Sequence, residues 1–100
     1  MPALLIDGTM MSESLPICEY IDEAFPDQGI RLIPKIEHNN KKESMLKRYQ
    51  VRRLCEVINS NTQPLIVGSV TKRVQKFGGD PKQWSIEVTE KGMNTFEKLV

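Results

Sequence analysis

The sequence predicts an α+β fold in which a short β-hairpin and one helix precede three further helical segments. Three observations support this fold class. The apolar residues 4–6 and the stretch 9–11 flank Asp7-Gly8, a pair that readily supplies the positive φ angles of a tight hairpin turn. Apolar side chains recur at helical spacing in residues 14–25 and 41–59. Finally, Asp80-Pro81 has the composition of a helix N-terminus.

The first helix is expected over residues 14–25. Pro16 suits its first turn, where the backbone N–H groups have no intrahelical partner, and Pro26 ends it. Apolar side chains gather on one face and acidic ones largely on the other: Ile17, Ile21, Ala24 and Phe25 against Glu19, Asp22 and Glu23. An irregular connector with two prolines follows, and a subdomain boundary is expected there.

Three separate helical segments are expected in the second half of the chain. After residues 41–59, Pro64 interrupts the pattern, a helix is expected over 65–74, and Gly78-Gly79 ends it. The last helix begins at Asp80, with Gln83 at capping-box spacing. Its apolar stripe contains a glycine that would let a neighbouring helix come close: Trp84, Val88, Gly92, Phe96 and Leu99.

Composition excludes several classes of protein. The 100 residues suit one small domain, and neither a membrane-spanning apolar run nor a secretory signal is present, so we expect a cytoplasmic protein without a membrane partner. Cys18 and Cys55 are interpreted as small buried hydrophobic residues and His38 as a solvated loop residue. No metal site is expected, because these residues lack metal-ligand spacing.

Charge is distributed unevenly along the chain. Residues 1–30 carry acidic side chains and no lysine or arginine, whereas residues 31–53 are rich in lysine and arginine. The basic stretch 41–53 is compatible with nucleic-acid binding or with a solvated helix face. The second interpretation is favoured because no aromatic residues are interleaved for base stacking, and no nucleic-acid partner is expected.

Ser12-Glu13-Ser14 marks a candidate binding site at the start of the first helix. A helix N-terminus presents unpaired N–H groups and a partial positive charge, which favour a carboxylate or phosphate. Ser14 adds a hydroxyl donor, and Glu13 would attract an ammonium group. Together these groups would suit a ligand that carries a carboxylate and an ammonium group close together, as the end of an amino acid does. The alternative is that Ser14 simply caps the helix.

Several motifs carry a resemblance to a known family. The stretch MPALLIDGTMMSESLPICEYIDEAFP, then RLIP, QPL and Trp84 with Gly92, resembles the glutathione transferases, and most of all their zeta class, the maleylacetoacetate isomerases. The resemblance implies a thioredoxin-like layer, here the hairpin and first helix, followed by part of an all-helical domain. The implied boundaries are residues 1–34, an extended linker at 35–46, and residues 47–100.

The resemblance also implies a glutathione site, which is transferred position by position. Glu13 and Ser14 match the pair that binds the γ-glutamyl end of glutathione. Met1 and Pro2 match the backbone contact to its cysteinyl unit. Gln63 of QPL and Ser69 match further residues of the site, whereas Val67 stands where the class has an asparagine.

No catalytic residue is assigned, because the family's serine motif precedes the equivalent of Pro2. The resemblance therefore implies that this chain is a fragment from the middle of a transferase that also has further C-terminal helices. The complete protein is expected to isomerise maleylacetoacetate with glutathione, in phenylalanine and tyrosine catabolism, as a homodimer formed through its helical region. This chain by itself is expected to be inactive; the alternative is a non-catalytic, transferase-like interaction module.

Overall fold

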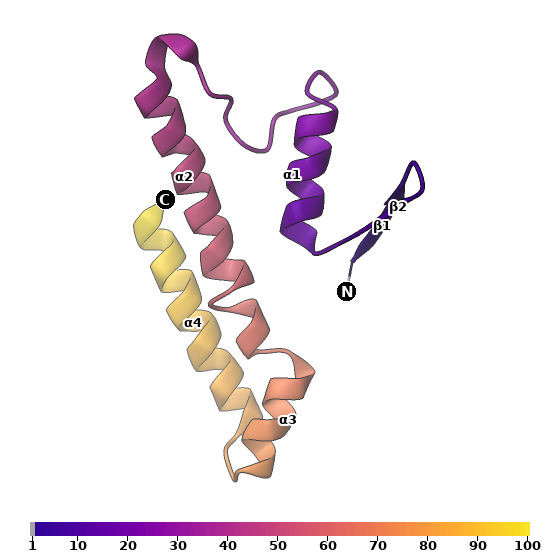
Figure 1. The fold of residues 1–100 in the computed structure, drawn as a ribbon. Helices are drawn as coiled ribbons and strands as arrows, with labels where there is room; N and C mark the ends of the chain where they lie inside the picture. Colours follow the sequence, from indigo (N-terminus) through magenta and orange to yellow (C-terminus); the bar gives the residue numbers. More distant parts are fainter. Residues whose placement is uncertain (1) are drawn as a thin grey trace. The chain divides into compact units, whose positions relative to one another are not determined.

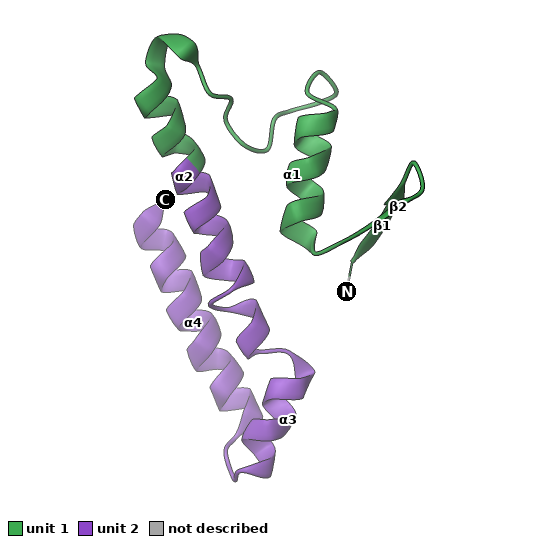
Figure 2. Cartoon of the chain, in the orientation of Figure 1, with its two compact units in different colours: residues 1–48 green, residues 49–100 purple. Residues whose placement is uncertain are grey.

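A computed structural model describes residues 2–100 and confirms the α+β prediction (Figure 1). The elements in chain order are β1 (Ala3–Ile6), β2 (Thr9–Ser12), α1 (Ser14–Ala24), η1 (His38–Asn40), α2 (Lys41–Asn59), η2 (Gln63–Leu65), α3 (Gly68–Lys76) and α4 (Pro81–Leu99). The chain divides into two compact units, residues 1–48 and 49–100, and the division falls within α2 (Figure 2). The domain boundaries expected after residues 34 and 46, on either side of the linker, remain predictions.

The hairpin of unit 1 forms as its turn sequence predicts. β1 and β2 are antiparallel, with Ile6 opposite Thr9, and the turn residues Asp7 and Gly8 have φ angles of 46° and 77°. Two positive φ angles in succession are the signature of the tight turn that best matches strand twist. β2 contacts α1, whereas the cross-strand pair Leu5 and Met10 remains exposed.

Helix α1 buries an acidic residue, which corrects the prediction that Asp22 lies on the polar face. Asp22 is only 7% exposed. Its Oδ1 accepts a hydrogen bond from the backbone N–H of Leu32 at 2.8 Å, and its Oδ2 accepts one from Ile33 at 3.3 Å. Arg31 lies 3.3 Å from Oδ2 and also donates to the Asp22 carbonyl at 2.7 Å. The acid is buried because the connector supplies these partners, which a helical periodicity does not reveal.

The connector is also attached to the start of α2. The buried hydroxyl of Ser44 accepts a hydrogen bond from the backbone N–H of Glu37 and donates one to the Lys41 carbonyl, each at 3.0 Å. Arg48 donates to the Pro34 carbonyl at 2.8 Å. Polar side chains of both flanking helices therefore bind the backbone of this irregular segment.

The prediction that Cys18 is a buried hydrophobic residue is wrong. Cys18 is exposed and Cys55 is half-buried, and both are free thiols. In unit 1, α1 contacts β2 and, through Asp22, the connector, and these contacts leave Cys18 uncovered. Cysteine is usually buried, so composition alone gave the wrong environment here.

Unit 2 packs around the turn between α2 and α3. Its most buried residues are Val57, Thr62 and Gly92, and η2 and α3 both contact α4. The helix predicted over residues 41–59 is confirmed as α2. The helix expected from residue 65 instead begins at Gly68, because residues 63–65 form the separate turn η2 and Val67 is extended.

Helix α4 begins as predicted, with Asp80 as its cap. Asp80 Oδ1 accepts hydrogen bonds from the backbone N–H groups of Lys82 at 2.9 Å and Gln83 at 3.3 Å. The second half of the expected capping box is absent, since the Gln83 amide donates to Glu87 instead, at 2.9 Å. The cap therefore depends on Asp80 alone.

Replacing Asp80 with alanine is expected to lower the free energy of unfolding by about 1 kcal/mol, because two backbone donors lose their acceptor. Chemical denaturation followed by circular dichroism measures the change. Asp80→Ser keeps an acceptor oxygen and should cost only a fraction of this amount. Equal losses for the two variants would contradict a capping role.

No helix within residues 2–100 is long and apolar enough to cross a membrane.

Candidate functional site

The candidate site at the start of α1 is built on an unusual backbone conformation. Glu13 occupies the N-cap position with φ 73° and ψ 123°, and its side chain makes no capping hydrogen bond. Ser14 is already the first helical residue. The structure thus does not place Ser14 as the cap, and both side chains are exposed.

The left-handed φ of Glu13 is energetically costly for a residue with a Cβ atom. Such conformations cost about 1–3 kcal/mol and persist where the surrounding structure enforces them, often at binding sites. Here β2 ends at Ser12 and α1 starts at Ser14, so Glu13 alone makes the turn from strand to helix. The strained residue is one of the two that the sequence marked as a ligand-binding pair.

The first turn of α1 has two backbone donors directed at its open end. The Ile17 N–H is bonded to the Glu13 carbonyl at 3.1 Å, and Pro16 has no N–H. The N–H groups of Ser14 and Leu15 therefore remain at the positive end of the helix dipole. Such an end binds an anion such as a carboxylate or a phosphate, and the adjacent Glu13 supplies a negative charge that would attract an ammonium group.

The remaining predicted site residues fall elsewhere in the chain. Pro2 is exposed and directly precedes β1, whereas Met1 lies outside the described residues. Gln63 opens η2, and Ser69 lies in the first turn of α3; both are exposed in unit 2. In unit 1, Glu13 and Ser14 lie together at the start of α1. In unit 2, Gln63 and Ser69 lie at the starts of two successive helices, η2 and α3. Their roles in binding stay predictions.

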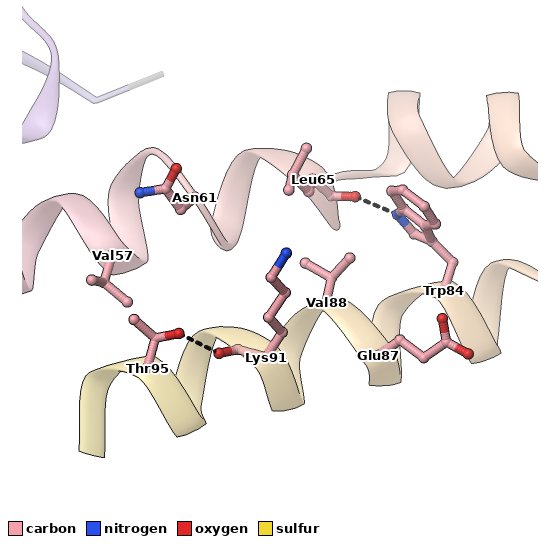
Figure 3. Close-up of a pocket in the computed structure, with 8 residues that line it drawn as sticks. All are labelled: Val57, Asn61, Leu65, Trp84, Glu87, Val88, Lys91 and Thr95. Carbon is pink, nitrogen blue, oxygen red and sulfur yellow. Dashed lines mark hydrogen bonds between the residues drawn. The ribbon is translucent and has the colours of Figure 1, made fainter. Parts of the chain in front are cut away.

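Unit 2 also contains a groove that the sequence did not predict. It encloses about 520 Å³ along α4 and the α2–η2 segment. Figure 3 shows its lining residues, which are Val57, Asn61, Leu65, Trp84, Glu87, Val88, Lys91 and Thr95. The indole Nε1–H of Trp84 donates to the Leu65 carbonyl at 2.7 Å. Helical spacing marked Trp84 and Val88 as one stripe but did not indicate which segment they face.

The electrostatics of unit 1 centre on Asp22. The backbone N–H of Leu32 lowers the pKa of this carboxyl most, against the opposing effect of burial, and Ile33, Arg31 and Arg48 lower it further. Asp22 is therefore held as a carboxylate that binds the connector. No group of three side chains suited to a metal ion occurs within residues 2–100.

Comparison with known proteins finds several that this chain resembles. The model of the glutathione S-transferase N-terminal domain matches residues 1–29, the segment that contains the hairpin, Glu13, Ser14 and α1. Maleylacetoacetate isomerase of Mus musculus is 36% identical over 99 residues, covering 99% of this chain and 40% of its own length. The same-named protein of Emericella nidulans is 34% identical over 89 residues, covering 89% and 36%.

Over nearly its whole length, the chain is similar to glutathione S-transferases. A further relative, a probable glutathione S-transferase of Coccidioides immitis, is 31% identical over 90 residues, covering 90% of this chain and 36% of its own.

The solved structures agree on the fold. A glutathione S-transferase from Legionella pneumophila superposes with a TM-score of 0.72 at 20% identity, over 97% of this chain and 48% of that one. The chain thus spans about two fifths of the length of the curated relatives and about half of the solved transferase. The observed hairpin and helices are a section of the transferase fold.

Proposed function

We propose that the start of α1 binds the γ-glutamyl end of glutathione. The observation that carries this proposal is the strained Glu13 directly before Ser14, within the segment matched by the transferase domain model. The N–H groups of Ser14 and Leu15 and the Ser14 hydroxyl would hold the carboxylate. The Glu13 carboxylate would pair with the α-ammonium group.

We propose roles in glutathione binding for four further residues as well. The backbone at Met1-Pro2 would bind the cysteinyl unit. Gln63 and Ser69 would supply an amide and a hydroxyl, while Val67 offers no polar side chain there. Glutathione itself supplies the thiol, which must ionise before it can attack an electrophile. No residue of this chain is assigned to that ionisation.

For the complete protein we propose a zeta-class activity, glutathione-dependent cis-trans isomerisation of maleylacetoacetate in tyrosine catabolism. The proposal follows from the similarity to the maleylacetoacetate isomerases of Mus musculus and Emericella nidulans. A cytoplasmic homodimer formed through the helical region belongs to the same proposal. The 100-residue chain by itself is proposed to bind glutathione weakly and to lack turnover.

Two substitutions of Glu13 test the site. Glu13→Ala removes the carboxylate and keeps the Cβ, so it should abolish the glutathione-induced NMR shift of the Ser14 amide without raising stability. Glu13→Gly should abolish the same shift and raise the free energy of unfolding by about 1 kcal/mol, because glycine adopts the left-handed φ at little cost.

The measurement is a titration of the labelled chain with millimolar glutathione, together with chemical denaturation of all three proteins. Glu87→Ala, on α4 in unit 2, serves as the matched carboxylate control and should leave the Ser14 response unchanged. A Ser14 amide that does not respond in the unaltered chain, or responds equally in Glu13→Ala, would refute the proposed site.

The second candidate function, a non-catalytic interaction module, is favoured by one observation. Three large apolar side chains in succession along α2 are half or more exposed, namely Met45 (50%), Leu46 (52%) and Tyr49 (56%). Exposed apolar clusters often mark protein-protein contacts. Light scattering that finds only monomer at high concentration, with no partner in a pull-down, would count against this candidate.

A further inference from the structure

The turn η2 carries Gln63 but has little internal support. Its hydrogen bonds run from the Leu65 N–H to the Thr62 carbonyl at 3.1 Å and from the Ile66 N–H to the Gln63 carbonyl at 3.2 Å. A single 3₁₀ turn with bonds of this kind is a weak element by itself. The Gln63 side chain is exposed, so its own packing does not fix its position. Any fixed geometry at Gln63 must come from neighbours.

Helix α4 holds the residue before Gln63. Thr62 is 4% exposed, and its hydroxyl donates to the Val57 carbonyl at 2.7 Å. On the α4 side it lies against Gly92, so closely that a Cβ atom at Gly92 would come within 2.1 Å of the Thr62 hydroxyl oxygen. The absence of a side chain at Gly92 thus allows Thr62 to pack directly on the helix backbone.

The same helix holds the residue two positions after Gln63. The Trp84 indole donates its Nε1–H to the Leu65 carbonyl at 2.7 Å, as Figure 3 shows. Trp84 and Gly92 are eight residues apart on α4, about 12 Å along the helix axis. One rigid helix therefore fixes the backbone on both sides of Gln63-Pro64.

We infer that Trp84 and Gly92 are positioning residues for Gln63: by holding Leu65 and Thr62, they fix the backbone that carries the Gln63 amide. This inference rests on the proposed glutathione function. It goes beyond that function because it assigns a role in binding to Trp84 and Gly92, neither of which is among the residues proposed to contact glutathione. The competing account is that Trp84 merely fills space beside Val88 and Leu65.

The test uses Trp84→Phe, which keeps an aromatic ring but removes the N–H donor together with part of the indole. We expect the backbone and side-chain amide signals of Gln63 to move, and their shift on adding glutathione to fall at least threefold, while the Ser14 response stays unchanged. Val88→Ala is the comparison variant: it removes packing in the same groove and keeps the hydrogen bond, so it should lower stability with little effect on the Gln63 response.

A second measurement needs no substitution. In the unaltered chain, which has a single tryptophan, the indole N–H signal should exchange slowly with solvent because of its hydrogen bond to Leu65. Rapid exchange of this indole N–H would overturn the inference. The inference would also be overturned if Trp84→Phe left both the Gln63 signals and their response to glutathione unchanged. Glutathione that shifts Ser14 but not Gln63 would also overturn it, while leaving the proposed site at α1 intact.

Discussion

Replacing Gly92 with alanine is expected to lower the free energy of unfolding by about 1–3 kcal/mol, although alanine is the better helix former. The added Cβ would lie 2.1 Å from Oγ1, 2.8 Å from Cγ2 and 3.0 Å from Cβ of Thr62. Thr62 is buried, branched at Cβ and hydrogen-bonded to Val57, so rotating its side chain does not relieve the overlap. The turn and α4 must move apart.

Chemical denaturation measures this loss, and the chain offers a matched control. Gly68 opens α3 with nothing within 4 Å of an added Cβ, so Gly68→Ala should change stability by less than about 0.5 kcal/mol. Combining Gly92→Ala with Thr62→Ala should cost less than the sum of the two single changes, since the second removes Oγ1 and Cγ2, the two atoms that the new Cβ would approach most closely. Equal stability of Gly92→Ala and the unaltered chain would contradict the close packing.

Replacing Asp22 with asparagine is expected to release the connector from α1. The amide keeps the size of the carboxyl but loses its charge, so the hydrogen bonds to Leu32 and Ile33 weaken and Arg31 loses its ion pair. Amide hydrogen exchange at Leu32 and Ile33 should accelerate severalfold. Asp27→Asn, the same change at an exposed acid beyond α1, should leave these rates unaltered.

The same carboxylate makes stability depend on pH in a defined direction. Because the folded structure lowers the pKa of Asp22, its contribution is fully present above the pKa of the unfolded chain, about 3.9. It is lost as the pH falls through the lower pKa of the folded state. Thermal denaturation between pH 2 and 6 should show that the melting temperature falls with decreasing pH, and falls less in Asp22→Asn than in the unaltered chain. Parallel plots of melting temperature against pH for the two proteins would exclude this linkage.

Local sequence signals predicted much of this fold, because they depend on neighbouring residues. Asp7-Gly8 determined the turn and hence the hairpin register, and Asp80-Pro81 determined the start of α4. Gly92 was expected to admit a neighbouring helix, whereas the segment that packs against it is a turn, through Thr62. That identity depends on the path of the chain between α2 and α3, which periodicity does not contain.

The burial of Asp22 could not be predicted for a related reason. Its partners are ten and eleven residues away in a segment without regular structure, and no helical pattern reveals a long-range hydrogen bond to such a segment. At the candidate site, the sequence identified Glu13 and Ser14 through their chemistry. It gave no sign of the backbone strain at Glu13, because a left-handed φ usually marks glycine, asparagine or aspartate.

The connector between α1 and α2 has a consequence for proteolysis. A protease must draw roughly ten residues of backbone into an extended form, yet Leu32, Ile33, Pro34 and Glu37 each have a main-chain group bound by a helix side chain. A trypsin-like enzyme would meet Arg31 and Lys35 in this segment. The rate of cleavage there would therefore report how often the hydrogen bonds to Asp22, Ser44 and Arg48 open. Limited proteolysis of the connector thus measures local unfolding of unit 1.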